Sequence, residues 1–79
     1  MYWLRSTFLD YCQRKGINLL KDDLKFIEKL LRLFPPDRQK SIMVRYCEEW
    51  HKGMAECENA AQSENFGRRR ANLYLNSLV

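Results

Sequence analysis

The sequence predicts an all-α protein, a small single-domain four-helix bundle. Apolar residues recur at helical spacing in four stretches, and glycine, proline or small polar residues separate those stretches. The chain has 79 residues, of which 46% are hydrophobic, so it can bury one modest core. We expect helices at about 2–15, 19–34, 36–58 and 64–78, within a single helical domain over residues 1–79.

The first helix is predicted from one apolar face that contains Leu4, Phe8 and Tyr11. Gly16 follows the last helical residues and suits the left-handed position that ends many helices. Ile17 is expected to pack back over that turn. Such a short connection predicts a helical hairpin with the next segment.

The second helix has the strongest pattern, and its charged face is expected to be exposed to water. Glu28 and Arg32 on that face have the spacing of an ion pair within a helix. Asn18 is expected to cap the start, and Pro35-Pro36 to end the helix at Phe34. The apolar stripe is Leu20, Leu24, Ile27, Leu31 and Phe34, widened by Leu19, Phe26, Leu30 and Leu33; the charged face is Lys21, Lys25, Glu28, Lys29 and Arg32.

The third and fourth helices flank a small polar connector, residues 59–65. Gly53 interrupts the third pattern, so a bend or an early end there is the alternative to a helix that continues to residue 58. Ser63 or Asn65 is expected to cap the fourth helix. The predicted core positions are Met43, Tyr46, Cys47, Trp50, Met54 and Cys57 in the third helix, and Phe66, Ala71, Tyr74, Leu75 and Leu78 in the fourth.

Composition limits the function classes. The net charge of +4 permits contact with phosphate or with an acidic protein, without requiring either. Three cysteines and no recognisable secretory signal favour free thiols and a cytoplasmic location. No apolar run is long enough for a membrane span, so no membrane contact is expected.

The segment Gly67-Arg68-Arg69-Arg70 is the most unusual local feature. In the first turns of a helix these arginines would oppose the helix dipole, and departures from a local rule often mark a working site. Guanidinium groups beside free helical N–H groups would suit phosphate or carboxylate, and Gly67 would allow a backbone to approach closely. The alternative is that the arginines are solvated, or that one of them pairs with the glutamates at 48, 49 and 56.

Further contact residues are expected around this segment. Arg69, Asn72 and Asn76 form a polar ridge that could contact base edges or a protein backbone. Trp3 and Lys15 are added as exposed aromatic and basic contacts, because aromatic residues are enriched in binding hot spots. The full set of partner-binding or phosphate-binding residues is therefore Arg68, Arg69, Arg70, Asn72, Asn76, Trp3 and Lys15.

Catalytic, cofactor and metal sites are not expected. Cys47 and His51 have a spacing that can chelate zinc, but Cys57 lies too far round the helix to join them. The same pair could act as nucleophile and base, yet no orienting acid is implied. No phosphate-binding glycine loop or metalloprotease signature is present.

Two function classes stay open. The first is a non-enzymatic interaction module, an adaptor, regulator or inhibitor that docks through basic and aromatic residues on a larger protein, such as one that handles nucleic acid. The second is a direct nucleic-acid-binding protein, acting as a dimer, that contacts phosphates through residues 67–70 together with Arg14, Lys15, Lys21 and Lys25. In size, basic balance and cysteine content the chain resembles the small accessory and regulatory proteins of phages, plasmids and other mobile elements.

Overall fold

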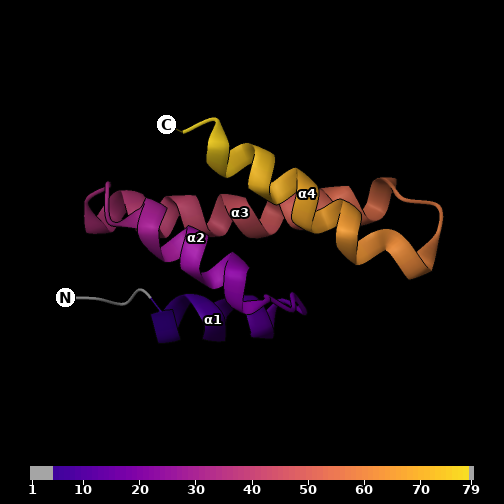
Figure 1. The fold of residues 1–79 in the computed structure, drawn as a ribbon, viewed down its shortest axis with the longest axis horizontal. Coiled ribbons are helices and arrows are strands. Elements are labelled where there is room, and N and C mark those ends of the chain that lie inside the picture. The colour runs from indigo at the N-terminus through magenta and orange to yellow at the C-terminus, as the bar shows by residue number, and fades with distance from the viewer. Residues whose placement is uncertain (1–4, 79) are drawn as a thin grey trace. The chain divides into compact units, whose positions relative to one another are not determined.

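The computed structural model describes the backbone of residues 5–78 and the side chains of residues 8–78. Over that range the chain forms four α-helices, one short 3₁₀ helix and no strand, which confirms the all-α prediction (Figure 1). Each helix lies within one residue of its predicted range or inside it. The elements are α1 (Arg5–Arg14), α2 (Lys21–Leu31), α3 (Pro36–Glu56), η1 (Ala60–Gln62) and α4 (Ser63–Asn76).

Two compact units divide the chain between Ser41 and Ile42, inside α3. Each unit has buried apolar side chains. In residues 1–41 these are Phe8, Cys12, Ile17, Ile27, Leu30 and Leu31. In residues 42–79 they are Ile42, Met43, Tyr46, Cys47, Trp50, Ala71 and Leu75. The single domain expected over residues 1–79 stays a prediction.

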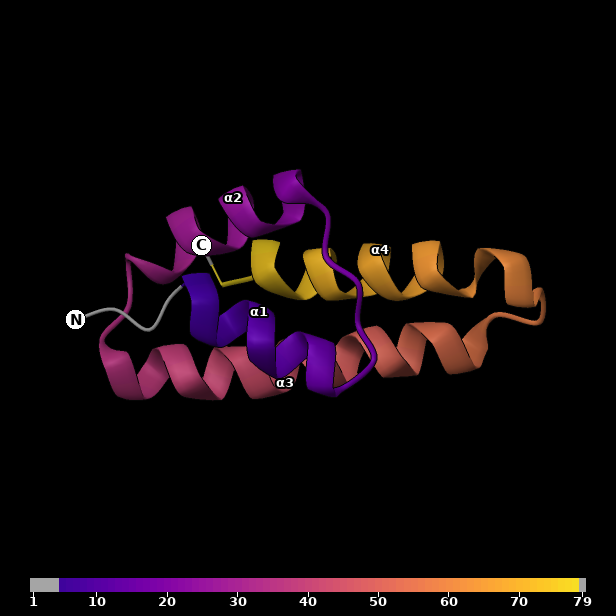
Figure 2. The same cartoon turned by 90° about the horizontal axis from the view of Figure 1, so that it is seen from below.

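The turn after α1 has the predicted geometry. Gly16 has a φ of +77°, the left-handed region that glycine enters without steric penalty. Its N–H donates to the Gln13 carbonyl at 3.0 Å, and the Ile17 N–H donates to the Cys12 carbonyl at 2.8 Å. These two bonds satisfy carbonyls that the end of the helix leaves free. Ile17 is fully buried, and the chain reverses direction into α2 (Figures 1 and 2). Leu4 lies outside the described residues.

The start of α2 differs from the prediction. Asn18 does not cap the helix, which begins at Lys21 with Leu20 as the residue before it. The Asp23 carboxylate accepts a hydrogen bond from the Leu20 N–H at 3.0 Å and so holds the first turn. Leu20 is therefore held outside the helix and is 59% exposed, so its predicted place in the core is wrong.

The end of α2 is fixed by a side chain from α3. The helix ends at Leu31, three residues before Phe34, and turn residues follow. The Gln39 amide donates to the carbonyls of Leu31 and Phe34, each at 2.9 Å. Gln39 is 8% exposed, so these bonds satisfy carbonyls in a buried place. Leu33, in the turn, is 69% exposed, and its predicted place in the apolar stripe is wrong.

The charged face of α2 is exposed as predicted. Arg32 and Glu28 form the expected ion pair, with 3.7 Å between Nη2 and Oε2. Lys21, Lys25 and Lys29 are all exposed. This face therefore has the orientation that the sequence pattern predicted.

Two glycines bring α3 and α4 into close contact within residues 42–79. A Cβ atom at Gly53 would lie 2.6 Å from the Phe66 carbonyl oxygen, and one at Gly67 would lie 2.7 Å from the Trp50 carbonyl oxygen. Only hydrogen fits at either position, so the backbones can approach closely. α4 runs back beside α3 (Figure 2). α3 continues through Gly53 to Glu56, close to the predicted end at residue 58, so the alternative of an early end at Gly53 is not taken.

The buried side of α4 is formed by Gly67, Ala71 and Leu75. The sequence predicted that this side starts one residue earlier, at Phe66. Phe66 is 46% exposed, because the glycine beside it occupies the contact with α3. Its predicted place in the core is wrong, whereas those of Ala71 and Leu75 are confirmed.

The cap before α4 also differs from the prediction. The Asn59 side chain accepts a hydrogen bond from the Ala61 N–H at 3.0 Å and caps η1, which leads directly into α4. Ser63 is the first residue of α4, and its hydroxyl donates to the Ala60 carbonyl at 3.1 Å. Neither Ser63 nor Asn65 is the cap, because the 3₁₀ turn places the cap four residues before the helix.

Candidate interaction surface on the last helix

The three arginines of α4 point in three directions. α4 begins at Ser63, so Arg68 is its sixth residue and the arginines begin in its second turn. Consecutive helical residues point about 100° apart. The structure shows three separate environments for the arginines. One is an internal ion pair, one is the face of an aromatic ring, and one is solvent.

Arg70 is committed to glutamates of this chain. Its Nε donates to Glu49 Oε1 at 2.9 Å, and its Nη1 donates to Glu56 Oε2 at 2.6 Å. Both acceptors lie on α3, in the same unit. Arg70 therefore joins α4 to α3, which is the internal pairing that the sequence left open as an alternative. Its predicted contact with a partner is not supported by this geometry.

Glu49 is the centre of this charge cluster. Its side chain is only 10% exposed and is also bound by Arg45 Nε at 2.8 Å, with Lys52 Nζ at 3.6 Å. Hydrogen bonds from Arg45 and Arg70 favour the charged carboxylate over the acid. They lower the pKa of Glu49 to about 2. Arg45 also lies over the ring of Tyr74, 5.5 Å from its centroid, which adds a second link to α4.

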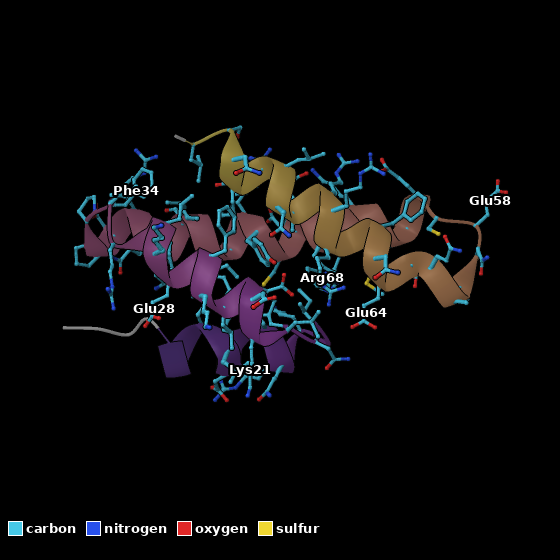
Figure 3. All side chains as sticks on the ribbon, viewed as in Figure 1. Lys21, Glu28, Phe34, Glu58, Glu64 and Arg68 are labelled. Carbon is cyan, nitrogen blue, oxygen red and sulfur yellow. The ribbon has the colours of Figure 1, made fainter. Side chains whose placement is uncertain are left out.

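Arg68 lies over a buried tryptophan. Its guanidinium carbon is 5.1 Å from the centroid of the Trp50 ring, a cation–π distance. Its Nη1 also donates to Asn65 Oδ1 at 3.3 Å. Arg68 extends from α4 and is half-buried (Figure 3). Arg68 covers the Trp50 ring, which also lies next to Gly67, so it contributes to the packing between α3 and α4.

Arg69 is exposed between two exposed apolar residues. Phe66 is 46% exposed and Leu73 is 63% exposed. The three residues are separated by three and four positions, so they lie on one side of α4. Among the described residues Arg69 has no hydrogen bond or ion pair. We call Phe66, Arg69 and Leu73 the α4 outer face.

The predicted asparagine ridge is present in part. Asn76 is exposed and continues the side of the helix on which Arg69 lies. Asn72 is half-buried, and its Oδ1 atom is buried without a hydrogen-bond partner among residues 8–78. The Asn72 side chain therefore points toward the interior of the protein. Of the predicted ridge, only Arg69 and Asn76 are exposed to a partner.

The other two predicted contact residues, Lys15 and Trp3, belong to residues 1–41 and not to the unit that contains α4. Lys15 is exposed in the turn after α1, in the other unit, with its Nζ 5.5 Å from the centroid of the Tyr11 ring. Trp3 lies outside the described residues. The predicted site therefore contributes Arg69 and Asn76 to the outer side of α4, with Arg68 at its edge.

The described residues contain neither a metal-binding cluster nor a membrane-spanning helix. Within residues 8–78 no group of three histidine, cysteine, aspartate or glutamate side chains could hold a metal ion. Cys12 and Cys47 are buried and Cys57 is half-buried, all as free thiols. None of the helices described between residues 5 and 78 combines the length and hydropathy that a membrane span needs.

Sequence reasoning missed the exposure of Phe66, because it is a large apolar residue at a position that fits a helical core stripe. One signal was available. Gly67, Ala71 and Leu75 have a regular four-residue spacing, and a line of small residues is typical of close helix contact. Choosing that line as the buried one turns Phe66 outward.

No protein-family model matches this chain, and the comparisons with curated proteins and with solved structures also gave no match.

Proposed function

We propose that this protein is a non-enzymatic interaction module that docks on an acidic surface of a larger protein through the α4 outer face. The observation that carries the proposal is the pair of exposed apolar side chains, Phe66 and Leu73, on either side of Arg69. Aromatic residues and arginine are the residue types that contribute most to binding at protein interfaces. No acidic residue lies between them along α4, so the face complements an apolar surface with acidic residues.

The way α4 is held supports this proposal. The glycine contact with α3, the Arg70 ion pairs and the Arg68–Trp50 contact fix the helix on its inner side. A fixed helix presents its outer side chains without the entropic cost of ordering a segment during binding. The face is therefore ready to bind as it stands.

Direct nucleic-acid binding through residues 67–70 has less support. That proposal needs several guanidinium groups directed at phosphates, whereas Arg70 is engaged by Glu49 and Glu56 and Arg68 lies over Trp50. A single exposed arginine, Arg69, supplies one phosphate contact, which gives little affinity.

The test uses two variants that each remove two exposed apolar side chains. We would introduce Phe66→Ala with Leu73→Ala on α4, and Leu20→Ala with Leu33→Ala beside α2 as the matched control. Tagged full-length protein would be used to capture partners from cells of the organism that encodes the chain. We expect one or a few proteins to be retained by wild type and by the control, and lost with the α4 variant.

The affinity of a captured protein would then be measured with purified components. Loss of one hot-spot side chain at an interface costs about 2 kcal/mol or more, which is a weakening of about 30-fold. Arg69→Glu should weaken binding further at low salt if the partner surface is acidic. Equal capture by the α4 variant and the control would refute the proposal.

A further inference from the structure

α2 carries a row of lysines that the docking proposal does not use. Lys21, Lys25 and Lys29 are exposed and lie four residues apart, so successive side chains are separated by about 6 Å along the helix axis. The buried residues Ile27 and Leu30 lie on the opposite side of the helix. The packing of α2 therefore holds the row on its water-facing side.

No acid within residues 8–78 forms an ion pair with a lysine of this row. Over residues 8–78 none of the three lysines has an ion pair or hydrogen bond. Glu28, which could pair with a neighbouring lysine, is bound by Arg32 instead. Asp22 is exposed near the row, and the structure shows no ion pair from it to a lysine.

The distribution of charge between the two units supports a function for this row. Residues 1–41 contain nine lysines and arginines against five acids, whereas residues 42–79 contain five of each. The whole net charge of +4 therefore belongs to the first unit. In the second unit, cations such as Arg45 and Arg70 are bound by glutamates.

We propose that Lys21, Lys25 and Lys29 of α2 form a second binding site, one that contacts the phosphate backbone of nucleic acid without reading its sequence. Lysine binds phosphate as a mobile point charge, and a regular row suits a regularly charged polymer. The row has no exposed aromatic residue or amide among its members to read a base, so affinity should depend on charge alone. The two proposed sites share no residue, because the lysines belong to residues 1–41 and the α4 outer face to residues 42–79.

The test compares two triple variants of the full chain. Lys21→Gln, Lys25→Gln and Lys29→Gln together remove the charge, whereas arginine at the same three positions keeps it. All of these residue types favour helix, and far-UV circular dichroism would check that each variant folds. Binding of a short DNA duplex would be followed by nuclear magnetic resonance of labelled protein between about 50 and 200 mM salt.

We expect amide shifts in residues 21–32 for wild type and for the arginine variant. Three phosphate contacts predict a log–log salt slope of about −2.7, which is a loss of about 40-fold over that range of salt. The glutamine variant should flatten the slope and lose the shifts.

Four results would overturn the proposal. They are unchanged binding by the glutamine variant, shifts confined to α4, no binding at about 50 mM salt, and binding to anionic lipid vesicles without binding to DNA.

Discussion

The two units join their helices by different means. In residues 1–41 the joints are made mainly by hydrogen bonds to the backbone, with Ile17 bound to Cys12 at one turn and Gln39 bound to Leu31 and Phe34 at the other. In residues 42–79 the joint between α3 and α4 depends on Gly53 and Gly67, which lie 14 positions apart in sequence, and on charges that cross between the helices. The hydrogen bonds of the first unit connect residues that are close in sequence. The glycine and ion-pair contacts of the second unit connect residues that are far apart in sequence.

The same difference appears in how charge is used. Glu49 gathers Arg45, Lys52 and Arg70 around one carboxylate, so the second unit uses these three cations for its own stability. The exposed lysines of α2 have no such partner among the described residues. A basic sequence therefore does not show by itself which cations can meet a partner. That depends on the acids that fold against them.

The largest expected effect comes from filling the glycine contact. Gly67→Ala would place Cβ 2.7 Å from the Trp50 carbonyl oxygen and from its ring atom Cδ1, so α3 and α4 must separate. We expect the free energy of unfolding to fall by about 2–3 kcal/mol, as for other overpacked sites. Gly16→Ala in the first unit is the comparison, because its Cβ would meet nothing within 4 Å. It should cost only about 1 kcal/mol, through its left-handed φ. Urea unfolding followed by circular dichroism would measure both, and equal effects would contradict the proposed close contact.

The next effect is a pH dependence centred on Glu49. Its pKa of about 2 in the folded protein lies below the ordinary value of 4.5. The stabilisation is therefore complete above about pH 4.5 and is lost as the pH falls toward 2. The shift corresponds to at most about 3 kcal/mol, and partial exposure of Arg45 and Lys52 reduces this to about 1–2 kcal/mol.

Glu49→Gln should therefore unfold more easily than wild type at pH 7, and the difference should shrink toward zero near pH 2. Glu58→Gln, at an exposed position on the connector (Figure 3), is the control and should show no such trend. A difference between Glu49→Gln and wild type that stayed constant from pH 7 to pH 2 would show that the charge cluster does not stabilise the second unit.

A smaller effect is expected at Gln39 in the first unit. Gln39→Met keeps the length of the side chain but removes both hydrogen bonds to the carbonyls of Leu31 and Phe34. The Leu31 carbonyl would keep its hydrogen bond from the Phe34 N–H at 3.0 Å, whereas the half-buried Phe34 carbonyl would lose its donor. The free energy of unfolding should therefore fall by about 1 kcal/mol. Ser41→Ala, which removes an exposed bond to the Asp37 carbonyl, should change it by less than about 0.5 kcal/mol. If the two variants behaved alike in urea, the turn after α2 would not depend on the glutamine.

Much of the local structure could be predicted, and the candidate site only in part. The left-handed turn at Gly16 and the ion pair between Glu28 and Arg32 depend on residues at most five positions apart, and both were predicted. The exposure of Arg69 was compatible with the sequence. The engagement of Arg70 by Glu49, 21 positions away, was one of several pairings that the sequence allowed.

The sequence by itself determined that this protein is helical and where its four helices lie, because helical periodicity and the residues at helix ends act over a few positions. Only the tertiary structure decided which of two neighbouring residues the last helix buries at its contact with α3. Phe66 and Gly67 are adjacent, so their side chains point about 100° apart around α4. The close backbone contact at Gly53 favours the rotation of α4 that buries Gly67 and exposes Phe66. That rotation also turns Arg70 toward the glutamates of α3 and leaves Arg69 in solvent, because the direction of each side chain follows from the same rotation of one helix.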